Sequence, residues 1–263
     1  MRVEYMREKI LEELCRIERD HNVKILFAVE SGSRAWGFPS TDSDYDVRFV
    51  FCHSVEWYLS IDEKRDVIEC PISDALDISG WDIRKALQLF RKSNPSILEW
   101  IHSPISYRQQ LDFPERLQQI AYDSFNKKAV LYHYLHMASK NYRLFLQKEK
   151  VKLKKYFYVL RPLFACKWIE EKGTLPPVEF ETLMNEVKLP AEIVSEIQVL
   201  LQQKKAGAEL DDEKQVKILN LFLERQIDYY EQYAKKLEKG QEVHVEELNE
   251  LFREIVCGSE CSH

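Results

Sequence analysis

The residues best suited to chemistry lie between Glu30 and Phe51, in the segment ESGSRAWGFPSTDSDYDVRFVF. Asp44 and Asp46 are two positions apart and lead into an apolar run. Side chains two apart on an extended chain face the same side, so these carboxylates converge, and Arg48 continues on that face. Convergent carboxylates suit Mg²⁺, which binds a few such ligands together with nucleotide phosphates. The spacing therefore predicts a magnesium site at the start of a strand.

A Gly-Ser pair precedes these carboxylates in the same segment. Gly32 and Ser33 follow the apolar run VKILFAV, so we expect them at the end of a buried strand, where backbone N–H groups can receive a phosphate. A side chain at Gly32 would obstruct that approach, the Ser33 hydroxyl is a further donor, and Arg34 can reach negative charge beside it. The pair and the carboxylates predict a triphosphate site, suited to attack on the α-phosphorus with pyrophosphate leaving.

Such a reaction usually needs a further carboxylate that binds a second ion and acts on the proton of the attacking hydroxyl. We expect Asp77 to supply it, because Asp77 lies in the alternating segment SDALDISGWD with its apolar neighbours on the opposite face. Asp74 and Glu69 are weaker alternatives, and Asp82 is placed to cap the next helix.

Simpler interpretations exist for each signal. Ser and Asp are common in turns, so STDSDYD alone is most often a polar turn that leads into a strand. We predict triphosphate contacts for Arg34, Arg48 and Lys85, with Arg84 as a further candidate, although each cation alone is more often a solvated surface charge.

Four aromatic or imidazole side chains also have two interpretations. Trp36 and Trp81, beside the motifs, either stack on a base or fill the core. His133 and His136 are three positions apart and share a helical face, which suits a metal. Without a third ligand nearby, we expect these histidines to be ordinary core or surface residues.

Predicted strands and helices place the motifs in a small mixed sheet. Pro71 marks a turn between two strands, and Asp82 and Asn94 are suitable helix caps. The expected elements are a helix over 3–21, strands over 23–29 and 46–51, two strands within 65–79, and helices over 83–92 and 95–100.

From about Tyr107 onward, segments with helical periodicity replace the strands. We therefore predict an α+β protein in which a mixed-sheet core over 1–108 precedes an all-helical domain over 109–263. The expected helices cover 114–148, 154–172, 178–187, 191–204, 212–239 and 245–256.

Composition restricts the class of protein. The net charge of −6 argues against non-specific coating of nucleic acid, which requires an excess of Lys and Arg. Six cysteines lack a paired ligand spacing, so we expect a cytoplasmic protein without structural disulfides or zinc. No apolar run is long enough to cross a membrane. Cys257, Cys261 and His263 are interpreted as part of a frayed terminus.

Charge divides the helical part unevenly. Residues 140–172 hold ten Lys or Arg against three Glu, whereas residues 209–263 hold fourteen Asp or Glu against seven Lys or Arg. Cations interleaved with tyrosines suit phosphates and stacked bases, although an ordinary helix with solvated lysines has the same composition. The predicted acceptor-binding residues are Lys154, Lys155, Tyr158 and Arg161.

These motifs resemble the nucleotidyltransferase superfamily of DNA polymerase beta, whose pattern is Gly-Ser, a spacer, Asp-x-Asp and a later acidic residue. More narrowly, ESGSRAWGFPSTDSDYDVRF, DISGWDIRKAL, RKSNPSILEWIHSPISY and LRPLFACKWI are similar to the predicted nucleotidyltransferases associated with RNA ligases. The resemblance spans about 25–177. It implies a palm-like core, an NTP with Mg²⁺ or Mn²⁺, and transfer of a nucleoside monophosphate, but no particular acceptor.

The sequence therefore predicts a nucleotidyltransferase that uses an NTP, ATP first, and releases pyrophosphate. Residues 1–108 then carry the reaction and residues 109–263 bind the acceptor. An RNA end is the first choice of acceptor because of the basic, tyrosine-rich segment, followed by a protein hydroxyl and a small alcohol. The rival hypothesis is a non-catalytic nucleotide-binding regulator or antitoxin-like protein partner, and the intact carboxylates favour the enzyme.

Overall fold

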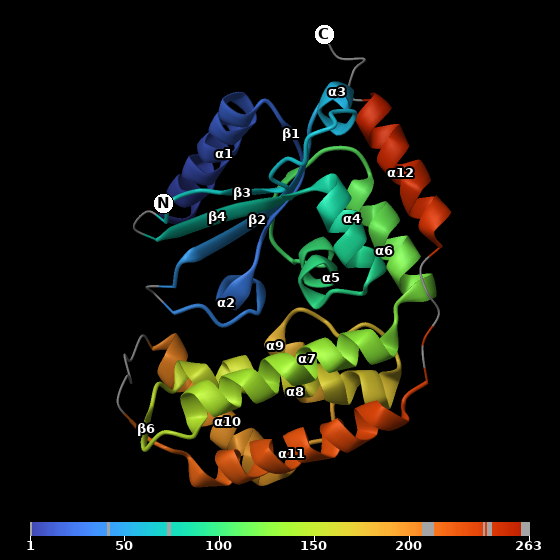
Figure 1. Cartoon of the computed structure of the whole chain (residues 1–263). Helices are drawn as coiled ribbons and strands as arrows, with labels where there is room; N and C mark the ends of the chain where they lie inside the picture. The colour runs from blue at the N-terminus through green and yellow to red at the C-terminus, as the bar shows by residue number, and fades with distance from the viewer. Residues whose placement is uncertain are drawn as a thin grey trace.

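The computed structural model describes residues 2–40, 43–72, 75–206, 213–238, 240 and 244–258, which form a mixed sheet with flanking helices and a helical half (Figure 1). The predicted α+β class is confirmed. In the described residues the main sheet has five strands in the order β3-β4-β2-β1-β5. Its strands are β1 (Lys24–Glu30), β2 (Tyr45–Cys52), β3 (Val67–Glu69), β4 (Leu76–Asp82) and β5 (Ser106–Gln109).

Burial explains the order of the strands. β1 is buried from its second residue to its end and lies inside the sheet, as its apolar run predicts. β4 alternates between buried and half-buried residues along its whole length and pairs in parallel with β2. The parallel pair has a consequence for the site, because the starts of β2 and β4 meet at the same end of the sheet.

Helices cover both faces of the sheet. On one face, α1 (Arg2–His21) buries Ile10, Leu14 and Ile17 against strand residues such as Val47. On the other face, the side chains of Asp82 and Asn94 accept backbone N–H groups and cap two helices, as predicted. The helices on that second face are α4 (Ile83–Arg91), α5 (Pro95–Ile101) and α6 (Phe113–Ser124), and α3 (Val55–Tyr58) is a short turn at the far end of β2.

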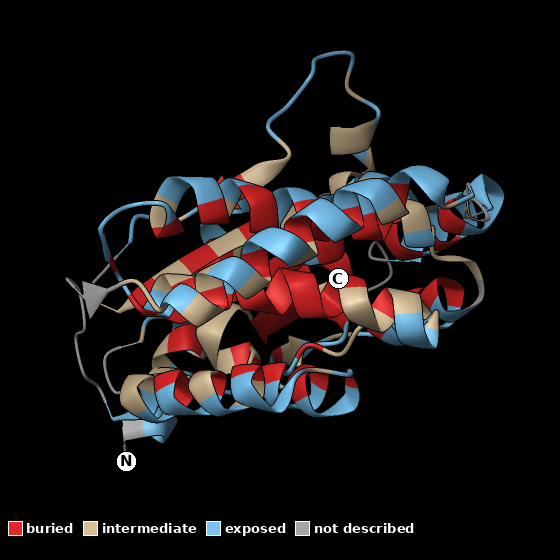
Figure 2. Ribbon diagram, turned by 90° about the horizontal axis from the view of Figure 1, so that it is seen from below, coloured by how far each residue is buried: buried red, intermediate tan, exposed pale blue. Residues whose placement is uncertain are grey.

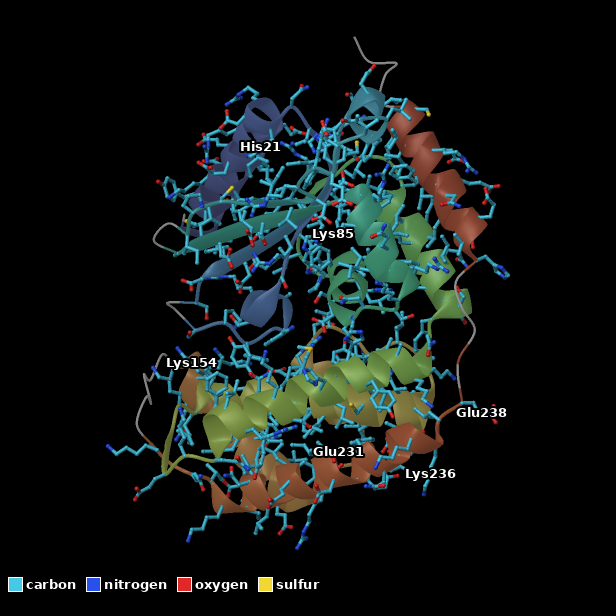
Figure 3. All side chains as sticks on the ribbon, in the orientation of Figure 1. His21, Lys85, Lys154, Glu231, Lys236 and Glu238 are labelled. Carbon is cyan, nitrogen blue, oxygen red and sulfur yellow. The ribbon has the colours of Figure 1, made fainter. Side chains whose placement is uncertain are left out.

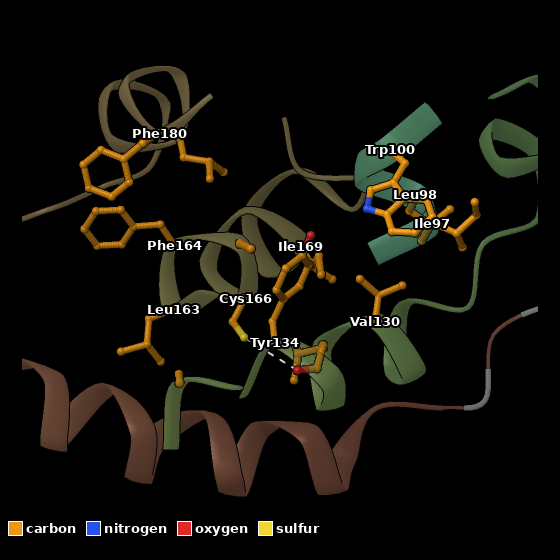
Figure 4. Packing of buried hydrophobic residues seen from close by; sticks show 14 of the residues in the cluster. Ile97, Leu98, Trp100, Val130, Tyr134, Leu163, Phe164, Cys166, Ile169 and Phe180 are labelled. Carbon is orange, nitrogen blue, oxygen red and sulfur yellow. Dashed lines mark hydrogen bonds between the residues drawn. The ribbon is translucent and has the colours of Figure 1, made fainter. Parts of the chain in front are cut away.

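The helical half packs its buried residues between helices, with exposed residues on the outside (Figure 2). In Figure 4, Phe164 stacks on Phe180 with ring centroids 5.6 Å apart, and the Cys166 thiol points to the carbonyl of Leu131. The helices of this half are α7 (Lys127–Asn141), a π-helical turn (Tyr142–Leu146), α8 (Lys154–Lys172), α9 (Phe180–Glu186), α10 (Ala191–Lys205) and α11 (Lys217–Lys236). The last helix, α12 (Val245–Gly258), returns to the core.

Two details of this half differ from the predictions. The single helix predicted over 114–148 is interrupted after Ser124, and Asn126 caps the new helix by accepting the N–H of Ala129 at 3.0 Å. The predicted all-helical part, 109–263, is mostly helical but also contains strand residues. A second, two-stranded sheet joins β6 (Lys150–Val151) to β7 (Glu213–Lys214).

Two helices beyond residue 108 pack on the core. Phe113 of α6 contacts Phe27 of β1, with ring centroids 5.8 Å apart. Phe252 of α12 meets Tyr58 edge-on, with ring centroids 5.1 Å apart. In Figure 1, α12 runs beside α4 of the core. The division into 1–108 and 109–263 therefore stays a prediction. None of the helices in the described ranges is long and apolar enough to cross a membrane.

The loop between β1 and β2 is anchored in the helical half. It begins with α2 (Gly32–Ala35) and then buries Phe38, whose ring lies 4.8 Å from that of Phe157 and 5.4 Å from that of Phe180. The backbone N–H of Phe180 donates to the carbonyl of Trp36 at 2.9 Å. The segment that carries the Gly-Ser pair is therefore held by α8 and α9 as well as by the sheet.

Phe38→Ala should lower the free energy of unfolding by about 3 kcal/mol, because it leaves a cavity among these rings. Urea unfolding measures this loss. Ile61→Ala is the control: Ile61 is 100% exposed, so its truncation should change stability by less than about 0.5 kcal/mol. Equal effects of the two substitutions would contradict the anchoring of the loop.

Candidate active site

Asp46 and Asp77 lie side by side on one face of the sheet. They are direct partners in the parallel register of β2 and β4. Both are half-buried, whereas their neighbours Tyr45, Leu76 and Ile78 are buried on the opposite face. Because partners in register point to the same side, the two carboxylates face one region, as the alternation predicts.

Arg48 bridges the two aspartates. Its Nη2 atom lies 2.7 Å from Oδ2 of Asp77 and 3.5 Å from Oδ1 of Asp46. Its Nη1 atom also donates to the carbonyl of Asp77 at 3.0 Å. The guanidinium group therefore fixes the spacing of the two carboxylates and offsets part of their negative charge.

Gly32 lies directly against Asp46. A Cβ atom at Gly32 would overlap Oδ2 of Asp46, and Gly32 has a positive φ of 60°. The backbone N–H of Ser31 donates to the carbonyl of Asp46 at 2.8 Å. The sequence predicts a glycine here for access of a phosphate, and the structure adds a second reason, which is the close approach of the Asp46 carboxylate.

Arg34 holds the segment that leads to Asp46. Its side chain donates to the carbonyl of Ser43 at 2.8 Å and to that of Asp44 at 3.1 Å. Its guanidinium carbon lies 3.7 Å from the centre of the Tyr45 ring. These contacts clamp the loop, and a triphosphate contact for Arg34 stays a prediction.

Glu30 is a site residue that the sequence analysis missed. It is fully buried, and its Oε1 accepts the backbone N–H of Asp46 at 2.7 Å. The hydroxyl of Tyr107 donates to its other oxygen. Burial raises the pKa of Glu30 to about 6 against these hydrogen bonds. A carboxylate at the end of an otherwise apolar buried strand was the signal that could have revealed it.

Electrostatics link the carboxylates of the site. Burial raises the pKa of Asp46, Arg48 opposes this shift, and the neighbouring charges of Asp77 and Asp44 add to it. Asp44 is exposed just before β2. The accumulation of negative charge at one place is the property that a cation or a basic group would relieve.

The donor chemistry fits Mg²⁺ through the carboxylates of Asp44 and Asp46, because this ion takes one or two carboxylates together with substrate phosphates. A set of three protein ligands is not assembled: within the described ranges, no three His, Cys, Asp or Glu side chains are grouped as for a metal ion. Asp77 is instead held by Arg48. A role of Asp77 as third ligand therefore stays a prediction.

The helical half contributes one predicted acceptor residue that lies close to the carboxylates. Tyr158 of α8 is 39% exposed, and its pKa is raised by burial and then by the charges of Asp46 and Asp44. The Lys155 ammonium lies 4.6 Å from the centre of the Tyr158 ring. Lys154 is exposed at the beginning of α8 (Figure 3).

Two predicted site residues lie elsewhere. Lys85 forms an ion pair with Asp66 at 2.9 Å in the first turn of α4, beyond the end of β4 opposite to Asp77 (Figure 3). Arg161 is 1% exposed and bonds Glu99 at 2.7 Å, so it is closed to an acceptor. Composition and spacing do not reveal which cations are already paired, so the structure gives these two predictions no support.

The remaining candidates do not join the carboxylates. Glu69 is exposed and paired with Arg65, and Asp74 lies outside the described residues. Arg84 stacks on Tyr58, at the far end of the sheet. The two tryptophans pack against neighbouring rings, and the two histidines are exposed on α7; these residues are Trp36, Trp81, His133 and His136.

A Gly-Ser turn beside carboxylates from adjacent strands is the arrangement that characterises nucleotidyltransferases of the DNA polymerase beta type. The chain belongs to the RNA repair pathway DNA polymerase beta family, which it matches over residues 6–254. The predicted family resemblance is thereby confirmed, and the chain is a member of the nucleotidyltransferase superfamily.

Two individual proteins are similar to this chain. It is 49% identical over 251 residues to the uncharacterized protein YcgL of Bacillus subtilis (strain 168), covering 95% of this chain and 96% of that protein. A solved nucleotidyltransferase-like protein from Exiguobacterium sibiricum 255-15 aligns with 81% of this chain and 73% of its own at 11% identity, with a TM-score of 0.34.

Alanine substitution at two glycines tests the contact with Asp46. Gly32 and Gly37 both have a positive φ, so alanine at either position costs about 1–2 kcal/mol of stability. Only at Gly32 does the new Cβ overlap Asp46; around Gly37, no described atom lies within 4 Å of it. Gly32→Ala should therefore destabilise by about 2 kcal/mol more than Gly37→Ala in urea unfolding. Similar losses would contradict the close approach.

Glu30→Gln tests the buried carboxylate through pH. The pKa of Glu30 is about 6 in the folded protein and near 4.5 in the unfolded chain. The folded state therefore binds the proton more tightly, and wild-type stability is lost as pH rises through 6. Relative to wild type, Glu30→Gln should gain up to about 2 kcal/mol between pH 4.5 and pH 7.5. A difference in unfolding free energy that does not vary with pH would contradict this assignment.

Proposed function

We propose that the protein transfers a nucleoside monophosphate from an NTP, ATP first, to a hydroxyl group and releases pyrophosphate. The observation that carries this proposal is the placement of Asp46 and Asp77 as register partners, with Gly32 in contact with Asp46. Transfer of this kind depends mainly on positioning and on neutralisation of phosphate charge. Carboxylates beside a tight turn with backbone N–H donors suit that requirement.

Different residues are proposed to bind the phosphates and the metal ion. The Gly32-Ser33 turn holds the phosphates through backbone N–H groups and the Ser33 hydroxyl. Asp44 and Asp46 would hold Mg²⁺, or Mn²⁺ in its place, together with phosphate oxygens. When bound, the ion supplies charge neutralisation at the transferred phosphoryl group.

Asp77 serves the attacking hydroxyl in this proposal. It lies beside Asp46 on the same face, and its hydrogen bond from Arg48 fixes the direction of its carboxylate. A carboxylate held in this way can accept the proton of the hydroxyl as the new bond to phosphorus forms. Arg48, which lies between the two aspartates, is proposed to contact a phosphate oxygen as well.

The acceptor is proposed to be an RNA end. Support comes from Tyr158 of the helical half, whose pKa is raised first by burial and then by the charges of Asp46 and Asp44, and from the cations Lys154 and Lys155 beside it. An aromatic ring next to cations suits a stacked base and its phosphate. The name of the matched family refers to an RNA repair pathway, which agrees with this choice. A protein hydroxyl and a small alcohol are the alternatives.

ATP labelled at the α-phosphate tests the reaction. Wild-type protein with Mg²⁺ should transfer the label to RNA, and Asp46→Asn should lower the rate by at least about 100-fold. Asp77→Asn should abolish turnover but leave nucleotide binding within a few-fold, because it serves the hydroxyl. Asp66→Asn is the matched control, since this carboxylate pairs with Lys85 away from the site, and its rate should equal that of wild type.

Two outcomes would contradict the proposal. Equal rates in Asp46→Asn and wild type would place the reaction elsewhere. Tight NTP binding with no transfer to RNA, protein or small alcohols would instead favour a nucleotide-binding regulator. Transfer to protein or to an alcohol alone would keep the reaction and replace the acceptor.

A further inference from the structure

A cluster of buried and half-buried polar side chains lies where the loop between β1 and β2 meets the helical half. Arg161 of α8 donates to Oε1 of Glu99 in α5 at 2.7 Å and, through Nε and Nη2, to the carbonyl of Val178 at 3.1 Å. The hydroxyl of Tyr134 in α7 donates to the same Glu99 oxygen at 2.8 Å. This Glu99–Arg161 cluster joins a helix of the core to two helices of the helical half.

The cluster also contacts the loop through Trp36. The indole Nε1 of Trp36 donates to Oε2 of Glu99 at 3.4 Å, and the guanidinium carbon of Arg161 lies 4.8 Å from the centre of its ring. The Trp36 carbonyl accepts the N–H of Phe180 at 2.9 Å. Trp36 is therefore held by its side chain and by its backbone.

Trp36 in turn closes the Gly-Ser turn. Its backbone N–H donates to the carbonyl of Gly32 at 3.0 Å, and Gly32 lies against the carboxylate of Asp46. Contacts thus run without a gap from Arg161 and Glu99 through Trp36 to Gly32 and Asp46. A change in the Glu99–Arg161 cluster has a direct route to the phosphate turn.

The chemistry of the cluster favours a role in positioning over a role in stability. A buried ion pair is weak evidence for stability, because the loss of hydration offsets much of the attraction between the charges. A fully hydrogen-bonded buried network does make a local structure rigid and unique. Arg161 is held in this way by its hydrogen bonds to Glu99 and to the Val178 carbonyl. Its guanidinium group also lies over the Trp36 ring.

We infer that Glu99 and Arg161 are positioning residues that hold the Gly32-Ser33 turn against Asp46, so that the helical half sets the geometry of the phosphate site. The placement of the turn stands on the contacts alone. Only its consequence for turnover rests on the proposed function.

A buried hydrogen bond elsewhere in the helical half provides the control. The hydroxyl of Tyr156 donates to Asn220 at 2.7 Å and accepts the N–H of Val216 at 2.9 Å. Tyr156→Phe removes these bonds from the same helix, α8, without touching the loop between β1 and β2. This variant shows how the loss of buried hydrogen bonds in α8, away from the loop, affects exchange in the Gly-Ser turn.

Hydrogen–deuterium exchange in peptides that cover 31–40 tests the inference. Glu99→Gln and Arg161→Lys should each raise amide exchange there by about tenfold or more, whereas Tyr156→Phe should leave it unchanged. In transfer assays, the two variants should lower kcat by roughly 10-fold to 100-fold with little change in the acceptor KM. Trp36→Phe keeps the ion pair but removes the indole N–H that donates to Glu99, so it should also raise exchange in these peptides. If the charge variants fail to fold, this variant alone tests whether the cluster holds the turn.

Unchanged exchange over 31–40 in the folded variants, or an equal rise in Tyr156→Phe, would overturn the inference. A wild-type protein that transfers no nucleotide would contradict the proposed function alone, because the exchange results are independent of turnover. Faster exchange with unchanged kcat would overturn the link between the turn and the reaction.

Discussion

The site depends on the contact between Gly32 and the carboxylate of Asp46. A Cβ at this position would overlap Oδ2 and force the Asp46 carboxylate to move, and the left-handed backbone there favours glycine. This contact brings the end of β1 and the beginning of β2 together on the face that also carries Asp77. The Gly-Ser turn and the carboxylates then occupy one small region, as the proposed transfer from a nucleoside triphosphate requires.

A buried acid, Glu30, and a half-buried acid, Glu99, support this contact. Glu30 accepts the backbone N–H of Asp46 and so fixes its position. Burial raises the pKa of the Glu30 carboxyl group to about 6. Glu99 and Arg161 hold Trp36, which closes the turn. The sheet and the helical half therefore define the site together, which explains why the loop that carries the motif is buried at Phe38 among helices of the second half.

The residues with a periodic or local signal could be predicted from the sequence. The alternation of β4 placed Asp77 correctly beside Asp46, and Asp82 and Asn94 cap helices as expected. Long-range partners could not be predicted. Arg161 lies in a basic segment, and nothing local shows that Glu99, far away in sequence, neutralises it inside the protein. The edge strand β5 was missed because its sequence, SYRQ, is short and polar, and an edge strand needs little apolar surface.

Paramagnetic broadening by Mn²⁺ in the presence of ATP locates the ion without requiring turnover. In spectra of the backbone amides, we expect the signals of Gly32, Asp46 and Asp77 to broaden first, while those of Arg84 and Lys85, in α4 beyond the far end of β4, stay sharp. Broadening centred on Arg84 and Lys85, or spread evenly over the surface, would contradict a single site formed by the Gly-Ser turn and the carboxylates.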